Sequence, residues 1–212
     1  MRQRRVKNEG ERLAAHKEYI VKDGTSCRGK WAEKFGNDNA VFLELGCGRG
    51  KFITTLAEEN PENNYIGIEA RSSVALRALE KAGEKKLTNT LFVIDMVQDV
   101  CGLFREGEID GLYLNFSDPW PKERHAKRRL TYRSYIESYK KILKSGSFIE
   151  IKTDNDGLFD FALEELEACG VEVLEETRDL HASPFAEGKI TTEYEERFRL
   201  LKEKINYCKA KV

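Results

Sequence analysis

Long apolar runs are missing from this chain of 212 residues. No stretch approaches the roughly 20 apolar residues that a membrane-spanning helix needs. The N-terminal residues are charged and no apolar core follows them, which argues against a secretory signal. The sequence therefore predicts a cytoplasmic protein that does not enter a membrane.

Cysteine and histidine are sparse and scattered. The three histidines lie far apart in the sequence, and no two cysteines have the CxxC spacing of a zinc site. An odd number of dispersed cysteines also argues against a disulfide framework. The five are Cys27, Cys47, Cys101, Cys169 and Cys208. We expect reduced thiols and no structural metal.

Net charge is close to zero, at −1, but the charges are unevenly distributed. Residues 1–12 carry five Arg or Lys against two Glu, and the basic segment, residues 122–129, carries five against one. Residues 154–177 contain nine acids and no Lys or Arg, as expected of a solvated helix face. We therefore divide the chain into a basic, flexible segment over 1–30 and one domain over 31–212.

Short β-rich runs alternate with helical patterns, and the chain has only four prolines and no internal repeat. Strands are expected at 41–45, 65–69, 91–95, 111–116, 147–152, 171–176 and 205–209. Helices are expected at 51–59, 71–82, 132–143, 158–166 and 192–203, with loop over 178–191. This alternation predicts an α/β fold: a Rossmann-like, doubly wound, mostly parallel sheet of about seven strands, with helices on both faces and the last strand antiparallel.

Acids and glycines follow five successive strands. Gly46 to Gly50 follow the first strand, and Glu69 and Asp95 close the next two. Asp118 and Asp154 follow the fourth and fifth. Because parallel strands present their carboxyl ends at one edge, where ligands bind in such sheets, this distribution predicts a binding cleft.

The first loop reads ELGCGRG, residues 44–50. A dinucleotide fingerprint needs GxGxxG, and Lys51 stands where its third glycine belongs, which disfavours a dehydrogenase. The glycines Gly46, Gly48 and Gly50 allow close approach to a ligand. Glu44 in the same loop would repel phosphate and favour a cation.

S-adenosylmethionine is such a cation, with sulfonium and ammonium groups. The pattern E-L-G-x-G-x-G resembles the first motif of Rossmann-like methyltransferases. Glu69 is spaced to accept both ribose hydroxyls, as the acid of dinucleotide folds does. Asp95, or its bulky neighbour Met96, would then meet the adenine.

The fourth strand leads to a stiff corner and then to the basic segment. Asp118 is followed by Pro119 and Pro121, whose fixed φ angles stiffen the turn. Cations here can neutralise phosphates of a polyanion without reading its bases. They are Lys122, Arg124, Lys127, Arg128 and Arg129. We therefore expect a nucleic-acid base as acceptor, with Trp120 or Tyr194 available for stacking.

Four segments together resemble the bacterial tRNA (guanine-N7)-methyltransferases. They are ELGCGRGKF (44–52), NFSDPWPKERHAKRR (115–129), IKTDN (151–155) and TTEYEERF (191–198), and they occur along nearly the whole chain. The resemblance implies S-adenosylmethionine as donor and, as acceptor, the guanine at position 46 in the tRNA variable loop.

The resemblance also implies roles for single residues. The methyl donor would be held by Glu44, Glu69, Asp95 and Asp118 together with the loop glycines, and Asp118 would be the catalytic acid. Substrate would be held by Lys122, Asp154, Thr192, Glu193, Tyr194 and Glu195. Arg124, Lys127, Arg128 and Arg129 would lie along the RNA.

The chemistry of guanine agrees with this assignment. N7 has a free lone pair and no proton, so methyl transfer needs alignment rather than a general base. Asp118 and Glu195 are then better read as groups that orient guanine. Two alternatives stay open: a non-catalytic RNA-binding module, and methyl transfer to a small molecule or protein. We expect a monomer or homodimer that needs no other protein.

Overall fold

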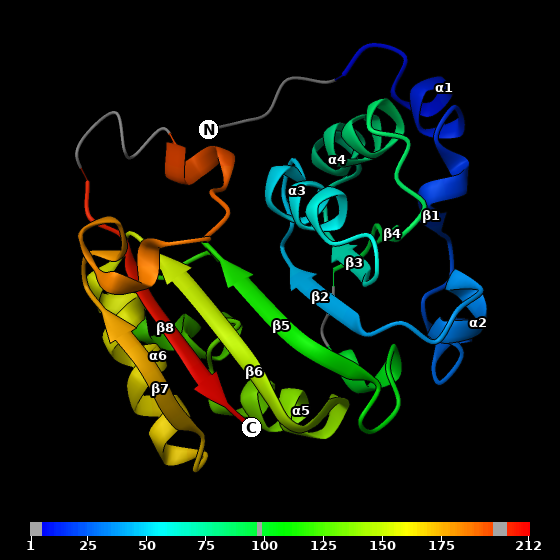
Figure 1. Ribbon diagram of the computed structural model, residues 1–212. Helices are drawn as coiled ribbons and strands as arrows, with labels where there is room; N and C mark the ends of the chain where they lie inside the picture. The colour runs from blue at the N-terminus through cyan, green and yellow to red at the C-terminus, as the bar shows by residue number, and fades with distance from the viewer. Residues whose placement is uncertain (1–5, 97–98, 197–202) are drawn as a thin grey trace.

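The computed structural model describes residues 6–96, 99–196 and 203–212, and the described strands form one mixed sheet (Figure 1). The strand order is β1-β4-β3-β2-β5-β6-β8-β7. The bounds are β1 Ile20–Val21, β2 Val41–Leu45, β3 Asn64–Ile68, β4 Thr90–Val93, β5 Ile109–Asn115, β6 Leu143–Thr153, β7 Glu172–Thr177 and β8 Asn206–Lys211. This architecture confirms the predicted fold class.

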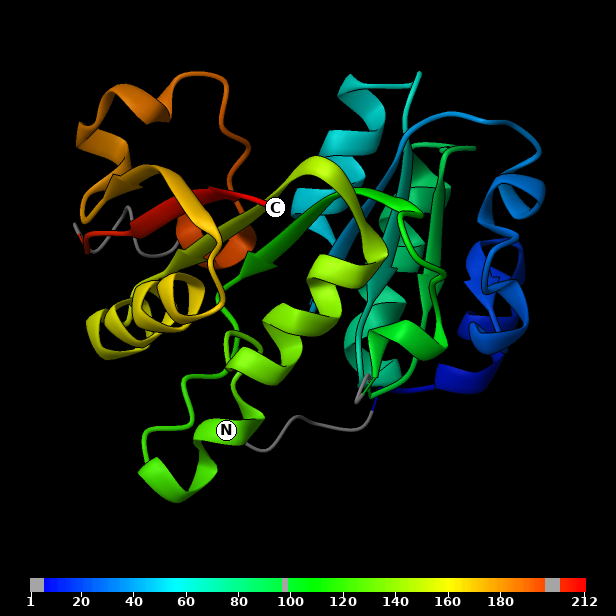
Figure 2. The same ribbon diagram turned by 90° about the horizontal axis from the view of Figure 1, so that it is seen from below.

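Helices cover both faces of the sheet. The α-helices are α1 Glu9–Ala14, α2 Trp31–Phe35, α3 Lys51–Glu59, α4 Ser72–Glu84, α5 Arg133–Ile142 and α6 Asp156–Ala168. Helices α3 and α4 pack together in one layer, and α5 and α6 lie side by side in the other (Figure 2). Among the described residues, no helix is long and apolar enough to span a membrane.

The central strands are buried on both faces, because their side chains alternate between two cores. Leu43 and Ile66 join the core beneath α5 and α6, whereas Tyr65 and Phe92 join the core beneath α3 and α4. Continuous apolar strands are typical of parallel sheets covered by helices. Packing on both faces holds the carboxyl ends of β2, β3 and β5 rigidly at one edge.

The strand order reverses between β2 and β5, which pair in parallel with Leu43 opposite Leu112. Ligands of open α/β sheets bind at such a switch point. The last strand, β8, is antiparallel, as the sequence predicted, and it lies between β6 and β7. This insertion brings the segment preceding β8 back to the same edge.

Two features differ from the expected element list. An eighth strand, β1, lies within the N-terminal 30 residues and pairs in parallel with β4, and Arg12 of α1 forms an ion pair with Glu80 of α4. At two residues, β1 is too short for a periodicity signal. Of the helix expected over 192–203, residues 193–196 are helical and 197–202 lie outside the described residues.

Candidate active site

Glu44, at the end of β2, is the buried acid of the switch point. It is 2% exposed, and its Oε1 accepts a hydrogen bond from Nδ2 of Asn115, at the end of β5, at 2.8 Å. Its Oε2 has no hydrogen-bond partner among the residues that the structure describes. Burial, with further repulsion from the carboxylates of Glu193 and Glu69, raises the pKa of Glu44 to about 7. A cationic ligand would offset the free-energy cost of burying the ionised carboxylate.

The glycine loop follows Glu44 and turns into α3. Gly46, Gly48 and Gly50 all have positive φ, and a Cβ on Gly50 would collide with Ala78 of α4. Glu69 stabilises the loop from the end of β3: its Oε2 accepts from the amide of Gly48 at 3.2 Å. The predicted donor-binding groups of the first two strands therefore lie together.

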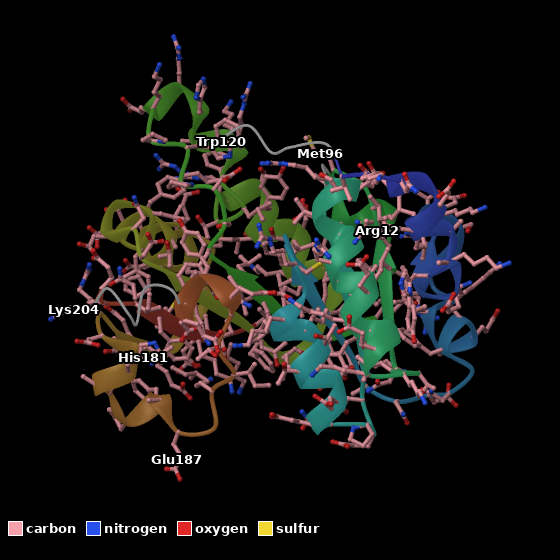
Figure 3. The ribbon with its side chains drawn as sticks, turned by 90° about the horizontal axis from the view of Figure 1, so that it is seen from above. Arg12, Met96, Trp120, His181, Glu187 and Lys204 are labelled. Atoms are coloured by element: carbon pink, nitrogen blue, oxygen red, sulfur yellow. The ribbon has the colours of Figure 1, made fainter. Side chains whose placement is uncertain are left out.

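Asp95 lies two residues beyond β4 and is exposed. Its Oδ1 accepts from the amide of Met96 at 2.7 Å. The side chain of Met96 is 67% exposed, so an apolar surface lies beside the predicted adenine-binding acid. Figure 3 shows Met96 at the same end of the molecule as Trp120.

Residues 116–121, here named the acceptor loop, have an unusual backbone. Phe116 and Trp120 both have positive φ, 51° and 40°, which is uncommon for large side chains and often occurs at functional sites. Arg129 supports the loop from behind: its Nε donates to the carbonyl of Pro119 at 3.0 Å and its guanidinium to that of Trp120 at 3.2 Å. Asp118 is exposed on this loop.

The basic segment projects from the body as a 3-10 helix, η4 (Glu123–Arg128), as Figures 2 and 3 show. Lys122, Arg124 and Lys127 are exposed. The guanidinium of Arg128 lies 5.0 Å from the ring centroid of Trp120. These cations border the acceptor loop, and Phe161 of α6 contacts the guanidinium of Arg129.

Residues 190–196, here named the strap, connect the two halves of the site. Glu193 forms an ion pair with Lys81 of α4, whose ammonium also donates to the carbonyl of Arg49 in the glycine loop. Tyr194 is 48% exposed, and its ring lies 5.2 Å from that of Phe116. The strap therefore contacts both the glycine-loop side and the acceptor loop.

Thr192 and Glu195 are buried at the base of the strap, whereas Asp154 is exposed just beyond β6. The structure thus brings most predicted site residues to one edge of the sheet. It adds three that sequence reasoning missed, Asn115, Lys81 and Lys152. A lysine at the end of the apolar run SFIEIK was the available signal for the last of these.

The residues predicted to bind the methyl donor suit S-adenosylmethionine. Glu44, Glu69 and Glu193 bring three carboxylates to the glycine loop, which matches a ligand carrying ammonium and sulfonium charges. The unpartnered oxygen of Glu44 provides a buried acceptor for such a group. No group of three or more His, Cys, Asp or Glu able to hold a metal occurs within 6–96, 99–196 and 203–212.

Solved structures of similar fold are methyltransferases. An antibiotic-related methyltransferase matches with a TM-score of 0.61 at 18% identity, over 86% of this chain and 92% of that one. The 30S ribosomal A1408 methyltransferase from an uncultured bacterium matches at 0.58 and 17%, over 90% and 94%. The fold is that of a class I methyltransferase, and the chain's methyltransferase relatives show that it uses S-adenosylmethionine.

Sequence comparison defines the family more closely. A model described as "Putative methyltransferase" matches residues 38–208. The tRNA (guanine-N(7)-)-methyltransferase of Lachnoclostridium phytofermentans is 46% identical over 93% of this chain and 92% of its own length. That of Geobacillus sp. is 44% identical over 95% and 91%. The chain belongs to the tRNA (guanine-N(7)-)-methyltransferase family.

Proposed function

We propose that this enzyme transfers a methyl group from S-adenosylmethionine to N7 of the guanine at position 46 in the variable loop of tRNA. The observation that carries the proposal is that the strap contacts both sides of the site. It joins a carboxylate-lined loop suited to a cationic donor with an exposed acceptor loop bordered by five Lys and Arg residues. The relatives named for tRNA guanine-N7 methylation support the same reading.

Guanine N7 already carries a lone pair, so the protein needs to supply alignment and charge stabilisation. Glu44, Glu69, Asp95 and the loop glycines would hold the donor, which supplies an electrophilic methyl group. Asp118 and Asp154 are exposed carboxylates at the ends of β5 and β6. In this proposal they would accept hydrogen bonds from N1–H and the 2-amino group, a pattern that adenine cannot satisfy.

The basic segment would bind the tRNA backbone. Lys122, Arg124 and Lys127 are exposed cations that can neutralise phosphates. Trp120 in the acceptor loop and Tyr194, whose ring contacts Phe116, offer aromatic rings on which a displaced base would stack for about 1–3 kcal/mol. Stacking of that size offsets the few kcal/mol needed to unstack a base in folded tRNA.

We further propose that the enzyme acts in the cytoplasm, as a monomer or homodimer without another protein. The assembly is measured by light scattering during gel filtration of the purified chain. Methyl transfer by the purified chain alone is expected. A requirement for a second protein would contradict this part of the proposal.

The test of function uses labelled S-adenosylmethionine and unmodified tRNA transcripts, one set of which carries 7-deazaguanine in place of guanine. Label is expected in normal tRNA and absent from the deaza transcripts, because only normal guanine has N7. A single guanine substitution at position 46 is expected to abolish labelling. Equal labelling of normal and deaza transcripts would reject N7 as the acceptor.

A further inference from the structure

A lysine and a glutamate are completely buried beneath the strap. Lys152, near the end of β6, and Glu195, in the strap, both have side-chain exposures of 0%. Their charged groups lie 3.4 Å apart, between Nζ and Oε2. Charged residues are almost never fully buried unless they are paired, so this pair requires an explanation.

Both oxygens of Glu195 face protein groups. Oε2 accepts from the amide of Thr192 at 3.3 Å, and the amide of Glu195 donates to Oγ1 of Thr192 at 2.9 Å, forming a reciprocal capping box. Oε1 lies 3.2 Å from Nε2 of His181, within ion-pair distance, but has no hydrogen-bond partner among the described residues. The carboxylate is therefore enclosed by its own chain, unlike the exposed Asp118 and Asp154.

Lys152 holds the strap at a second point. Its ammonium donates to the carbonyl of Ile190 at 2.8 Å, two residues before the capping box begins. The strap is thus fixed at both Ile190 and Glu195 to the end of one strand. Two residues between these points contact the two sides of the site. Glu193 contacts Lys81 on the donor side, and Tyr194 contacts Phe116 on the acceptor side.

We propose that Lys152 is a positioning residue of the methyl-transfer site and that Glu195 acts with it rather than touching guanine. This inference rests on the proposed function. The buried pair fixes the position and orientation of the strap relative to the sheet edge. It thereby places Glu193 and Tyr194 against the two substrates. Asp118, Asp154 and Tyr194 then recognise the guanine.

Electrostatics makes the pair suitable for this role. Removing one partner leaves an uncompensated buried charge, whereas removing both charges can be nearly neutral. A double-mutant cycle therefore separates positioning from direct contact. Gln at position 195 keeps an oxygen for the amide of Thr192, so the capping box survives the loss of charge.

The experiment compares Lys152→Met, Glu195→Gln and the double variant for melting temperature and for steady-state methylation of tRNA. Each single variant is expected to melt about 10 °C lower and to lose on the order of a hundredfold in kcat, with a smaller change in KM. The double variant is expected to recover most of the melting temperature and to return kcat to within about tenfold of wild type.

Leu143→Ala is the matched control, because Leu143 is buried at the opposite end of the same strand. It should lower the melting temperature comparably while leaving kcat at 25 °C unchanged. Recovery of stability without recovery of kcat in the double variant would show that the carboxylate of Glu195 touches guanine. Single variants that melt early yet keep full kcat would reduce Lys152 to a purely structural residue.

Failure of the proposed function gives a different result. If the wild-type enzyme methylates an acceptor other than guanine N7, the four variants are assayed on that acceptor. The same pattern of loss, recovery and control then supports the positioning role independently of the acceptor's identity. Loss of kcat in the single variants without recovery in the double variant on that acceptor would overturn the positioning role.

Discussion

At the scale of single residues, Glu44 is the group whose ionisation matters most to the donor site. Its folded-state pKa of about 7 lies above the ordinary value of 4.5, chiefly because burial disfavours the charged form. The ligand-free protein therefore binds a proton that an exposed glutamate would release. A cationic ligand favours the ionised carboxylate, so binding of the donor and loss of this proton are coupled.

We predict that the affinity for S-adenosylmethionine rises as pH increases through about 7, by up to tenfold per unit below that value. Calorimetry in buffers of different ionisation enthalpy should detect release of a proton on binding. Glu44→Gln should bind more weakly and without this pH dependence. An unchanged pH profile in Glu44→Gln would assign the dependence to another group.

The stability of the ligand-free protein should change in the opposite direction. Because the folded state holds the Glu44 proton more tightly than the unfolded state, ionisation destabilises the fold as pH rises from about 4.5 to about 7. The cost is absent below that window and complete above it. Denaturant titrations at pH 8 should therefore show Glu44→Gln to be more stable than wild type.

At the scale of elements, the acceptor loop depends on a side chain that follows it. Arg129 has the same charge as Lys127, and the sequence grouped both as RNA contacts. In the structure, the guanidinium of Arg129 donates to two carbonyls of the loop and lies on Phe161, whereas Lys127 is exposed. Equal charges in one segment thus have different surroundings.

Substituting these two residues separately should distinguish support from phosphate binding. Lys127→Met should weaken tRNA binding and leave kcat unchanged, because it removes one exposed cation. Arg129→Met should lower kcat by about tenfold or more, because the strained backbone around Trp120 loses two hydrogen bonds. Steady-state kinetics with saturating tRNA measures both, and identical effects from the two variants would contradict this distinction.

At the scale of the whole molecule, charge is separated along the chain despite a net value near zero. The acids of residues 154–177 belong to α6, β7 and their flanks, and a groove there is lined by Glu164, Glu167, Glu172 and Glu176. The basic segment projects from the sheet edge that carries the acceptor loop (Figure 2). Binding of a polyanion should therefore be confined to one part of the surface.

We predict that tRNA affinity falls linearly with the logarithm of salt concentration. Replacing Lys122, Arg124 and Lys127 by Gln should reduce the slope by roughly 2–3, since each phosphate contact contributes about 0.7–0.9. The control, Glu164→Gln with Glu167→Gln, should leave the slope unchanged. Filter binding at several salt concentrations measures it, and equal slopes for wild type and the triple variant would place the RNA elsewhere.

Much of the fold and of the donor side could be predicted from the sequence. The strands expected over 41–45, 65–69 and 111–116 correspond to β2, β3 and β5, and parallel strands must end at a common edge. Glu44 and Glu69 could be placed there without coordinates for that reason. Their roles, like those of Asp95, Asp118 and Asp154, stay predictions about ligand contact.

Pairing between distant segments was decided only by the tertiary structure. Asn115 and Glu44 are 71 positions apart, and Lys152 and Glu195 are 43 apart. Local pattern carries no information about which polar groups meet once water is excluded. The first pair depends on β5 lying beside β2, and the second on β8 inserting beside β6 and returning the strap to the sheet edge. Sequence alone therefore determined which strands end in acids and glycines. Burial decided which of those charges are free to meet a ligand and which are bound within the protein.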